Sequence, residues 1–162
     1  MIDQLDMYRV REHYDRRFEC HQRLSALLKK GKPIDYLDLA LGISEPHGNY
    51  SASEHGLGPQ ILGTKRPERI ASIMALAQSL VAETDPRKMI TTIYQAGIKY
   101  LKVSVGSEMA MMLKPDVFWV ANVRTVWTHL LLKHHFDLNH ANEELKLYRS
   151  QELPSEMVST ST

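Results

Sequence analysis

Residues 107–127, SEMAMMLKPDVFWVANVRTVW, combine small, apolar and polar side chains at the spacing of a DNA-reading helix-turn-helix. Such an element needs a small residue where its two helices cross and apolar residues beneath the turn. Ala110 and Leu113 take these places in the first helix, and Val120 and Val123 take them in the second. The spacing predicts that the second helix presents its outer side chains to the major groove of DNA.

The expected second helix carries one side chain suited to direct base reading, since the amide of Asn122 can pair with two atoms of adenine. Pro115 argues against this interpretation, because proline biases the preceding residue toward extended backbone and Lys114 stands where glycine is usual. A capped helix that runs into the interior of a bundle is the alternative. The predicted DNA contacts are Lys114, Asp116, Phe118, Asn122, Arg124 and Thr125, together with the basic residues Lys65, Arg66, Arg69, Arg87 and Lys88.

Arg124 and His129 form the pattern R-x-x-x-x-H, which is typical of helical ribonucleases. There the arginine holds the scissile phosphate and the histidine moves protons, because only histidine titrates near neutral pH. The same spacing recurs at Arg16 and His21, so the pattern has low specificity. A ribonuclease is therefore an alternative function.

The sequence predicts no metal site and no cofactor. The histidines of residues 129–140 lack the i, i+4 pairing that puts two imidazoles on one face of a helix. Glu45, His47, Glu54 and His55 gather in one segment without a conventional ligand spacing. The sequence also contains no lysine-bearing phosphate loop and no serine in a nucleophile elbow.

Length and composition indicate an ordinary globular protein. The chain has 162 residues, of which 43% are hydrophobic and 24% charged, so it has enough apolar side chains to fill a core. A single cysteine, Cys20, excludes an internal disulfide and favours a reducing compartment. No run approaches the roughly 18 apolar residues of a membrane span, and the N-terminus lacks a signal peptide. We expect a cytoplasmic protein.

The net charge of +1 does not by itself favour nucleic acid, because bases and acids alternate in blocks along the chain. Residues 63–102 are the most basic block, with seven bases and three acids. This block supplies the predicted phosphate contacts.

Apolar side chains recur at helical spacing over residues 3–30, which predicts a long amphipathic helix. At about 1.5 Å per residue the helix exceeds what a small core can cover, so we expect part of its apolar stripe to contact a second subunit. The stripe consists of Met7, Val10, Tyr14, Phe18, Leu24 and Leu28, with His21 on the same side.

Proline, glycine and capping residues divide the rest of the chain into further helices. We expect helices at 33–42, 67–83, 86–103, 107–113, 115–136 and 140–149, the last capped by Asp137 or Asn139. The β-branched content of residues 117–126 leaves a strand as the alternative there. Residues 43–66 follow no period and read as a long loop, which is functional, partly helical or a boundary.

Together these features predict an all-α protein with a single helical domain of about six helices over residues 1–150, the long loop 43–66 inside it, and a polar tail over 151–162. The leading functional hypothesis is a transcriptional regulator that binds double-stranded DNA through residues 107–127. We expect a homo- or hetero-oligomer formed through the N-terminal helix. The alternatives are a helical adaptor that binds another protein and the ribonuclease.

Overall fold

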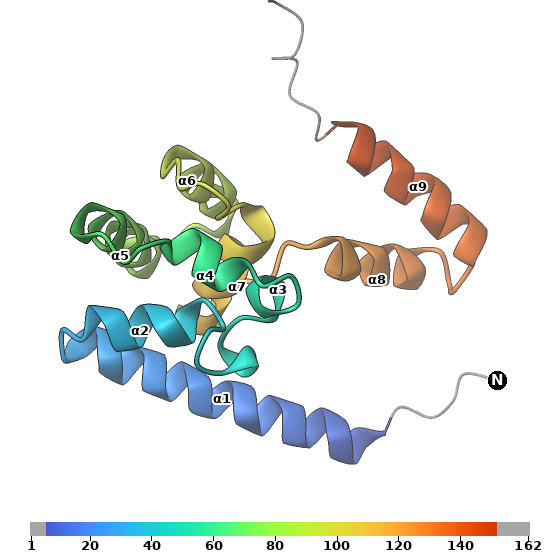
Figure 1. The fold of residues 1–162 in the computed structure, drawn as a ribbon. Helices are drawn as coiled ribbons and strands as arrows, with labels where there is room; N and C mark the ends of the chain where they lie inside the picture. The colour runs from blue at the N-terminus through green and yellow to red at the C-terminus, as the bar shows by residue number, and fades with distance from the viewer. Residues whose placement is uncertain (1–5, 152–162) are drawn as a thin grey trace, which may run out of the picture. The chain divides into compact units, whose positions relative to one another are not determined.

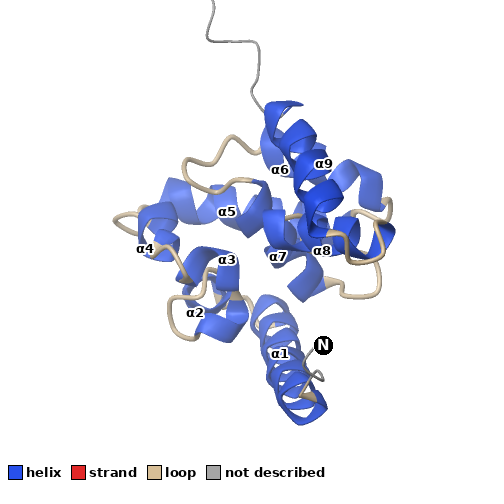
Figure 2. Ribbon diagram, turned by 90° about the vertical axis from the view of Figure 1, so that its right-hand side faces the viewer, coloured by secondary structure: helices blue, strands red, loops and turns tan. Residues whose placement is uncertain are grey.

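The computed structural model describes residues 6–151, with side chains as far as residue 146. These residues form nine α-helices and two short 3-10 helices and contain no strand (Figure 2). The all-α prediction is therefore confirmed, and the number of helices exceeds the six expected. The predicted tail falls almost wholly on residues 152–162, which lie outside the described residues.

Contacts divide the chain into two compact units, Met1–Val120 and Ala121–Thr162. The boundary lies inside the range 1–150 that the sequence predicted as one domain, and we describe each unit by itself. None of the described helices combines the length with the apolar character needed to cross a bilayer.

The first unit holds seven α-helices, coloured from blue to yellow in Figure 1. Their bounds are α1 (Met7–Lys29), α2 (Pro33–Ala40), α3 (Tyr50–Ser53), α4 (Leu57–Leu62), α5 (Pro67–Ala82), α6 (Met89–Gln95) and α7 (Val103–Leu113), with the 3-10 helices η1 (Pro46–Gly48) and η2 (Pro86–Lys88).

Local sequence signals account for most of these bounds. Asp6 caps α1 by accepting hydrogen bonds from the backbone N–H groups of Tyr8 and Arg9. Gly31 follows the helix with a φ of +63°, a conformation that glycine adopts without strain. Proline occupies the first turn of α2 and of α5, where its missing N–H costs nothing. The predicted helices over 33–42 and 67–83 are confirmed, and so is the described part of the helix predicted over 3–30.

The core of the first unit forms around α7, which contacts α1, α3, α5 and α6. Its side chains Val105, Met109 and Met112 are buried, and Ile93 of α6 packs against Gly106. A Cβ atom built on Gly106 would lie 2.7 Å from Ile93, so only glycine permits this approach of the two helices. Gly106 therefore lies inside a helix, whereas the sequence predicted it as the residue before one.

Of the alternatives left open for residues 43–66, the structure shows the partly helical one, because α3, α4 and η1 lie within this segment. The expected helix over 86–103 ends at Gln95, and Gly97 follows with a φ of +61°. These short elements escape a test of periodicity, since a helix of four to seven residues completes at most two turns.

The second unit is a helical hairpin of α8 (Val123–Lys133) and α9 (Leu138–Gln151). Leu130 and Ala141 are buried between the two helices, and the indole Nε1 of Trp127 donates to Asn142 over 2.9 Å. Asp137 caps α9 by accepting from the backbone N–H groups of residues 139 and 140, so it is the first of the two predicted candidates, Asp137 and Asn139, that caps this helix.

Candidate functional site

The two halves of α1 have different surroundings. In the second half Cys20 and Leu24 are buried against the first unit, whereas every residue from 7 to 16 is exposed. Arg17 lies at the junction and ties the exposed half to the rest of the unit. The candidate site therefore has two parts. One is the set of buried contacts that hold α1 in place, which we call the anchor, and the other is the exposed surface of α1.

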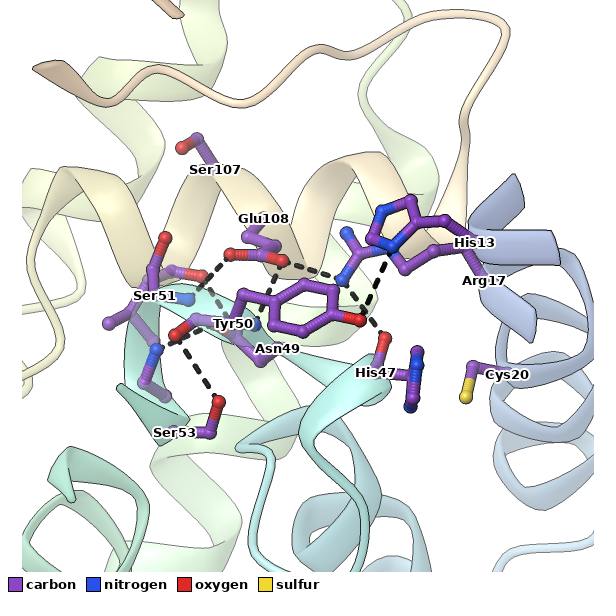
Figure 3. Close-up of polar contacts among 12 residues, drawn as sticks. His13, Arg17, Cys20, His47, Asn49, Tyr50, Ser51, Ser53, Ser107 and Glu108 are labelled. Atoms are coloured by element: carbon purple, nitrogen blue, oxygen red, sulfur yellow. Dashed lines mark hydrogen bonds and ion pairs between the residues drawn. The ribbon is translucent and has the colours of Figure 1, made fainter. Parts of the chain in front are cut away.

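The anchor centres on Glu108 of α7, whose residue surface is 3% exposed (Figure 3). Its Oε1 accepts from the Arg17 guanidinium over 2.6 Å and from the backbone N–H of Tyr50 over 2.9 Å. Its Oε2 accepts from the backbone N–H of Ser51 over 2.8 Å. One carboxylate thus neutralises a cation of α1 and satisfies two unpaired N–H groups at the start of α3.

Asn49 completes the same junction from a fully buried position. Its side-chain oxygen accepts from the backbone N–H of Ala52, which caps α3. Its amide nitrogen donates to the carbonyl oxygens of Ala40 and Val105 at 3.0 and 3.1 Å. The side chain therefore joins α2, α3 and α7 through hydrogen bonds that leave no buried polar atom of Asn49 unsatisfied.

Arg17 also donates to the carbonyl oxygen of His47 over 2.9 Å, and its guanidinium carbon lies 5.1 Å from the centre of the Tyr50 ring. His13 stacks on the same ring at 5.3 Å. Partial burial lowers the pKa of His13 from its ordinary value, and the positive charge of Arg17 adds to the shift.

A second carboxylate, Glu45, lies beside this anchor and pairs with Arg23 of α1. The hydrogen bond from Arg23 lowers the pKa of Glu45. The Cys20 thiol donates to the same carboxylate over 3.4 Å, and burial raises the pKa of that thiol to about 11. Burial and the raised pKa both favour the neutral thiol of Cys20 over the thiolate.

The exposed half of α1 carries an apolar stripe that no described residue of the first unit covers. Met7 is 65% exposed, Tyr14 63%, Phe18 46% and Val10 42%. The rings of Tyr14 and Phe18 stack at 6.4 Å. Farther along the same side of the helix, Nδ1 of His21 lies 2.7 Å from the carbonyl oxygen of Met112. This side of α1 therefore contacts α7 beyond the exposed stripe.

The expected helix-turn-helix geometry is not found, because residues 114–122 are not helical. The Lys114 carbonyl accepts from the N–H groups of Val117 and Phe118, which forms a turn at Pro115. Phe118 is 3% exposed and belongs to the core, and Asp116 lies in the turn. The second helix of the pair begins at Val123 instead of near residue 116, so the predicted helix over 115–136 is wrong in its first eight residues.

Asn122 and Thr125 interact with each other instead of forming a row of base-reading groups. The Asn122 side-chain oxygen accepts from the backbone N–H of Thr125 over 2.9 Å and from its hydroxyl over 3.1 Å, which caps α8. Lys114 donates to the carbonyl oxygens of Val81 and Glu83 at the end of α5. Three predicted contacts thus have structural partners within the chain.

The predicted basic residues do not form one patch. Lys65 and Arg66 precede α5 and Arg69 lies in its first turn, whereas Arg87 and Lys88 follow its far end. A helix of 16 residues separates the two groups by about 24 Å. Lys65 pairs with Asp38 at 3.2 Å and Arg87 pairs with Asp85 at 2.8 Å, so carboxylates border the two cations.

The two copies of the ribonuclease pattern have different surroundings in the fold. Arg124 and His129 are both exposed on α8, while Arg16 pairs with Glu12 and His21 faces a backbone carbonyl. Within residues 6–151, no three His, Cys, Asp or Glu side chains gather as ligands of one metal ion.

Sequence reasoning missed the Arg17–Glu108 pair, although one signal pointed to it. Glu108 is the only charged residue in the apolar helix VSVGSEMAMML, and a carboxylate in such a setting requires a buried partner. Spacing along the chain does not reveal that partner, because Arg17 is 91 residues away. No protein-family model matches this sequence, and no curated protein or solved structure shows significant similarity to it.

Proposed function

We propose that the chain is a protein-interaction module whose partner-binding surface is the exposed apolar stripe of α1, formed by Met7, Val10, Tyr14 and Phe18. The exposure of these four side chains on one side of an anchored helix carries the proposal. Isolated apolar residues are common on protein surfaces, whereas a contiguous group on one helix is typical of an interface. Two aromatic rings in the group suit a binding hot spot.

The anchor strengthens this proposal because it holds the stripe in place. The ion pair of Arg17 with Glu108 and the burial of Cys20 and Leu24 fix the second half of α1. A surface on a rigid helix loses little conformational entropy when it binds, which favours association.

The partner that fits best is a second copy of the chain. Residues 6–19 contain four bases and four acids, so two copies of this segment meet without net repulsion. An isologous contact buries the same stripe twice and matches apolar surface to apolar surface. The four stripe side chains form a small contact, so we expect a weak and reversible dimer. The eight charged residues are Asp6, Arg9, Arg11, Glu12, Asp15, Arg16, Arg17 and Glu19.

Sedimentation velocity over a range of protein concentrations tests the proposal. The wild-type chain should shift from monomer to dimer, and Tyr14→Glu should remain a monomer because it places a charge in the apolar contact. Tyr8→Glu is the matched control, since Tyr8 is 79% exposed and lies about 100° around the helix from Met7. A wild-type chain that stays monomeric, or an equal loss of dimer in both variants, would refute self-association through this stripe.

DNA binding remains a prediction from the sequence. A gel shift with random duplex DNA at two salt concentrations tests it, because binding through phosphates falls steeply as salt rises. Retention of duplex at low salt that disappears at high salt would support the DNA hypothesis. Absence of retention at both concentrations would count against it.

A further inference from the structure

Three aromatic rings from three different segments meet beside the Arg17–Glu108 pair (Figure 3). His13 comes from α1, His47 from η1 and Tyr50 from α3. The ring centres of His13 and His47 lie 5.3 and 5.4 Å from that of Tyr50, and 6.3 Å from each other. The proposed contact between copies does not use these two imidazoles.

Both imidazoles have one ring nitrogen next to an oxygen of the chain. His13 Nδ1 lies 3.4 Å from the Tyr50 hydroxyl, and His47 Nδ1 lies 3.6 Å from Glu45 Oε1. No hydrogen bond within residues 6–146 engages Nε2 of either ring. Each ring therefore has one nitrogen beside an oxygen of the chain, while its other nitrogen has no hydrogen-bond partner among residues 6–146.

The charges around the cluster favour an anion over a cation. The Arg17 guanidinium lies directly behind the Tyr50 ring. The neighbouring carboxylates Glu108, Glu45 and Glu12 are each paired with an arginine. An incoming cation would find no carboxylate without an arginine partner in this cluster, whereas an incoming anion meets imidazole N–H donors.

We propose that the cluster binds a phosphate-class oxyanion, either inorganic phosphate or the phosphate of a phosphomonoester. Nε2 of His13 donates a hydrogen bond to one of its oxygens, and His47 donates to another through Nε2 in its imidazolium form, in which Nδ1 keeps its contact with Glu45. The inference does not depend on self-association, because His13 and His47 are not part of the apolar stripe.

Titration of the full chain with inorganic phosphate, followed through the histidine ring protons by NMR, tests this site. Of the eight histidines, His13 and His47 should shift with saturation, while the others stay unchanged at constant ionic strength. A parallel titration with phenyl phosphate distinguishes inorganic phosphate from a phosphomonoester as the natural ligand. If phenyl phosphate binds more tightly than inorganic phosphate, the ligand is a phosphomonoester. Chloride at matched ionic strength should produce no saturable shift.

His13→Gln and His47→Gln should each weaken phosphate binding by roughly tenfold, because each removes one hydrogen bond to a charged group. His55→Gln, an exposed histidine of the same unit, is the control and should bind as the wild type does. Equal shifts at all histidines, the same response to chloride, or a saturable response to zinc with none to phosphate would overturn the proposal. The wild-type titration decides the outcome even where a variant fails to fold.

Discussion

Replacing Glu108 by glutamine tests whether the buried carboxylate holds the first unit together. Glutamine has the same size but only one acceptor oxygen, whereas Glu108 accepts three hydrogen bonds with its two oxygens. The new amide nitrogen must face either the Arg17 guanidinium or the backbone N–H groups of α3, and all of these are donors. Glu108→Gln therefore leaves at least one buried donor without a partner.

The expected cost follows from the burial of the pair. The side chains of Arg17 and Glu108 are 12% and 4% exposed, so solvent compensates little for a lost partner. Removing one member of such a pair lowers the free energy of unfolding by about 3–5 kcal/mol. The free energy of unfolding of a typical domain is only about 5–15 kcal/mol, so the first unit of the variant should unfold at a much lower urea concentration than that of the wild type.

Urea unfolding followed by circular dichroism measures the change, and amide hydrogen exchange localises it. The N–H groups of Tyr50 and Ser51 should lose protection in Glu108→Gln, while α8 and α9 keep theirs. Glu12→Gln is the matched control, because it breaks a 2.6 Å ion pair with Arg16 on the exposed side of α1 and should cost less than about 1 kcal/mol. Equal costs for both variants would refute the assignment of Glu108 as the anchor.

Three further predictions concern packing and pH. Tyr36→Phe should leave the free energy of unfolding unchanged or raise it by about 1 kcal/mol in urea titrations, because the fully buried hydroxyl has no hydrogen-bond partner. Gly106→Ala should lower the thermal midpoint, at a cost of about 1–3 kcal/mol, because the added methyl group would overlap Ile93. Hydrogen bonds from neighbouring basic side chains lower the pKa of Asp137 and Glu144. The hairpin should keep this stabilisation at pH values above the ordinary carboxyl pKa and lose it as the pH falls below about 4, because the unfolded state binds more protons there. Thermal unfolding scans over a range of pH measure the change.

The sequence was most informative where a helix end depends on one or two adjacent residues. Pro33 and Asp137 mark helix starts through their own side chains, and the fold confirms them. Such signals work because capping and proline geometry act over three or four residues and need no tertiary contact.

Residues 114–122 were misassigned because two opposing signals lie close together. Val120 and Val123 recur at helical spacing, yet Pro115 forces a turn and Asn122 caps a new helix. The spacing of apolar residues shows which side chains share one face of a helix, but it assumes that the backbone is helical. It therefore does not detect a turn that interrupts the helix.

The anchor was beyond sequence reasoning because it joins residues that lie far apart in the chain. Arg17 belongs to a helix whose apolar pattern looked complete without it, and the adjacent Arg16 has its own partner in Glu12. Only the packing of α1 against α7 shows which of its bases is buried with Glu108. Electrostatic partners of this kind depend on tertiary geometry, which a single sequence does not encode as spacing.

Cys20 gives the chain a natural reporter of helix detachment. The thiol is the only one in the sequence, and in the native state it is enclosed between α1 and the rest of the first unit. An alkylating reagent can reach the thiol only when α1 separates from the rest of the first unit. The rate of labelling therefore measures how readily this local opening occurs.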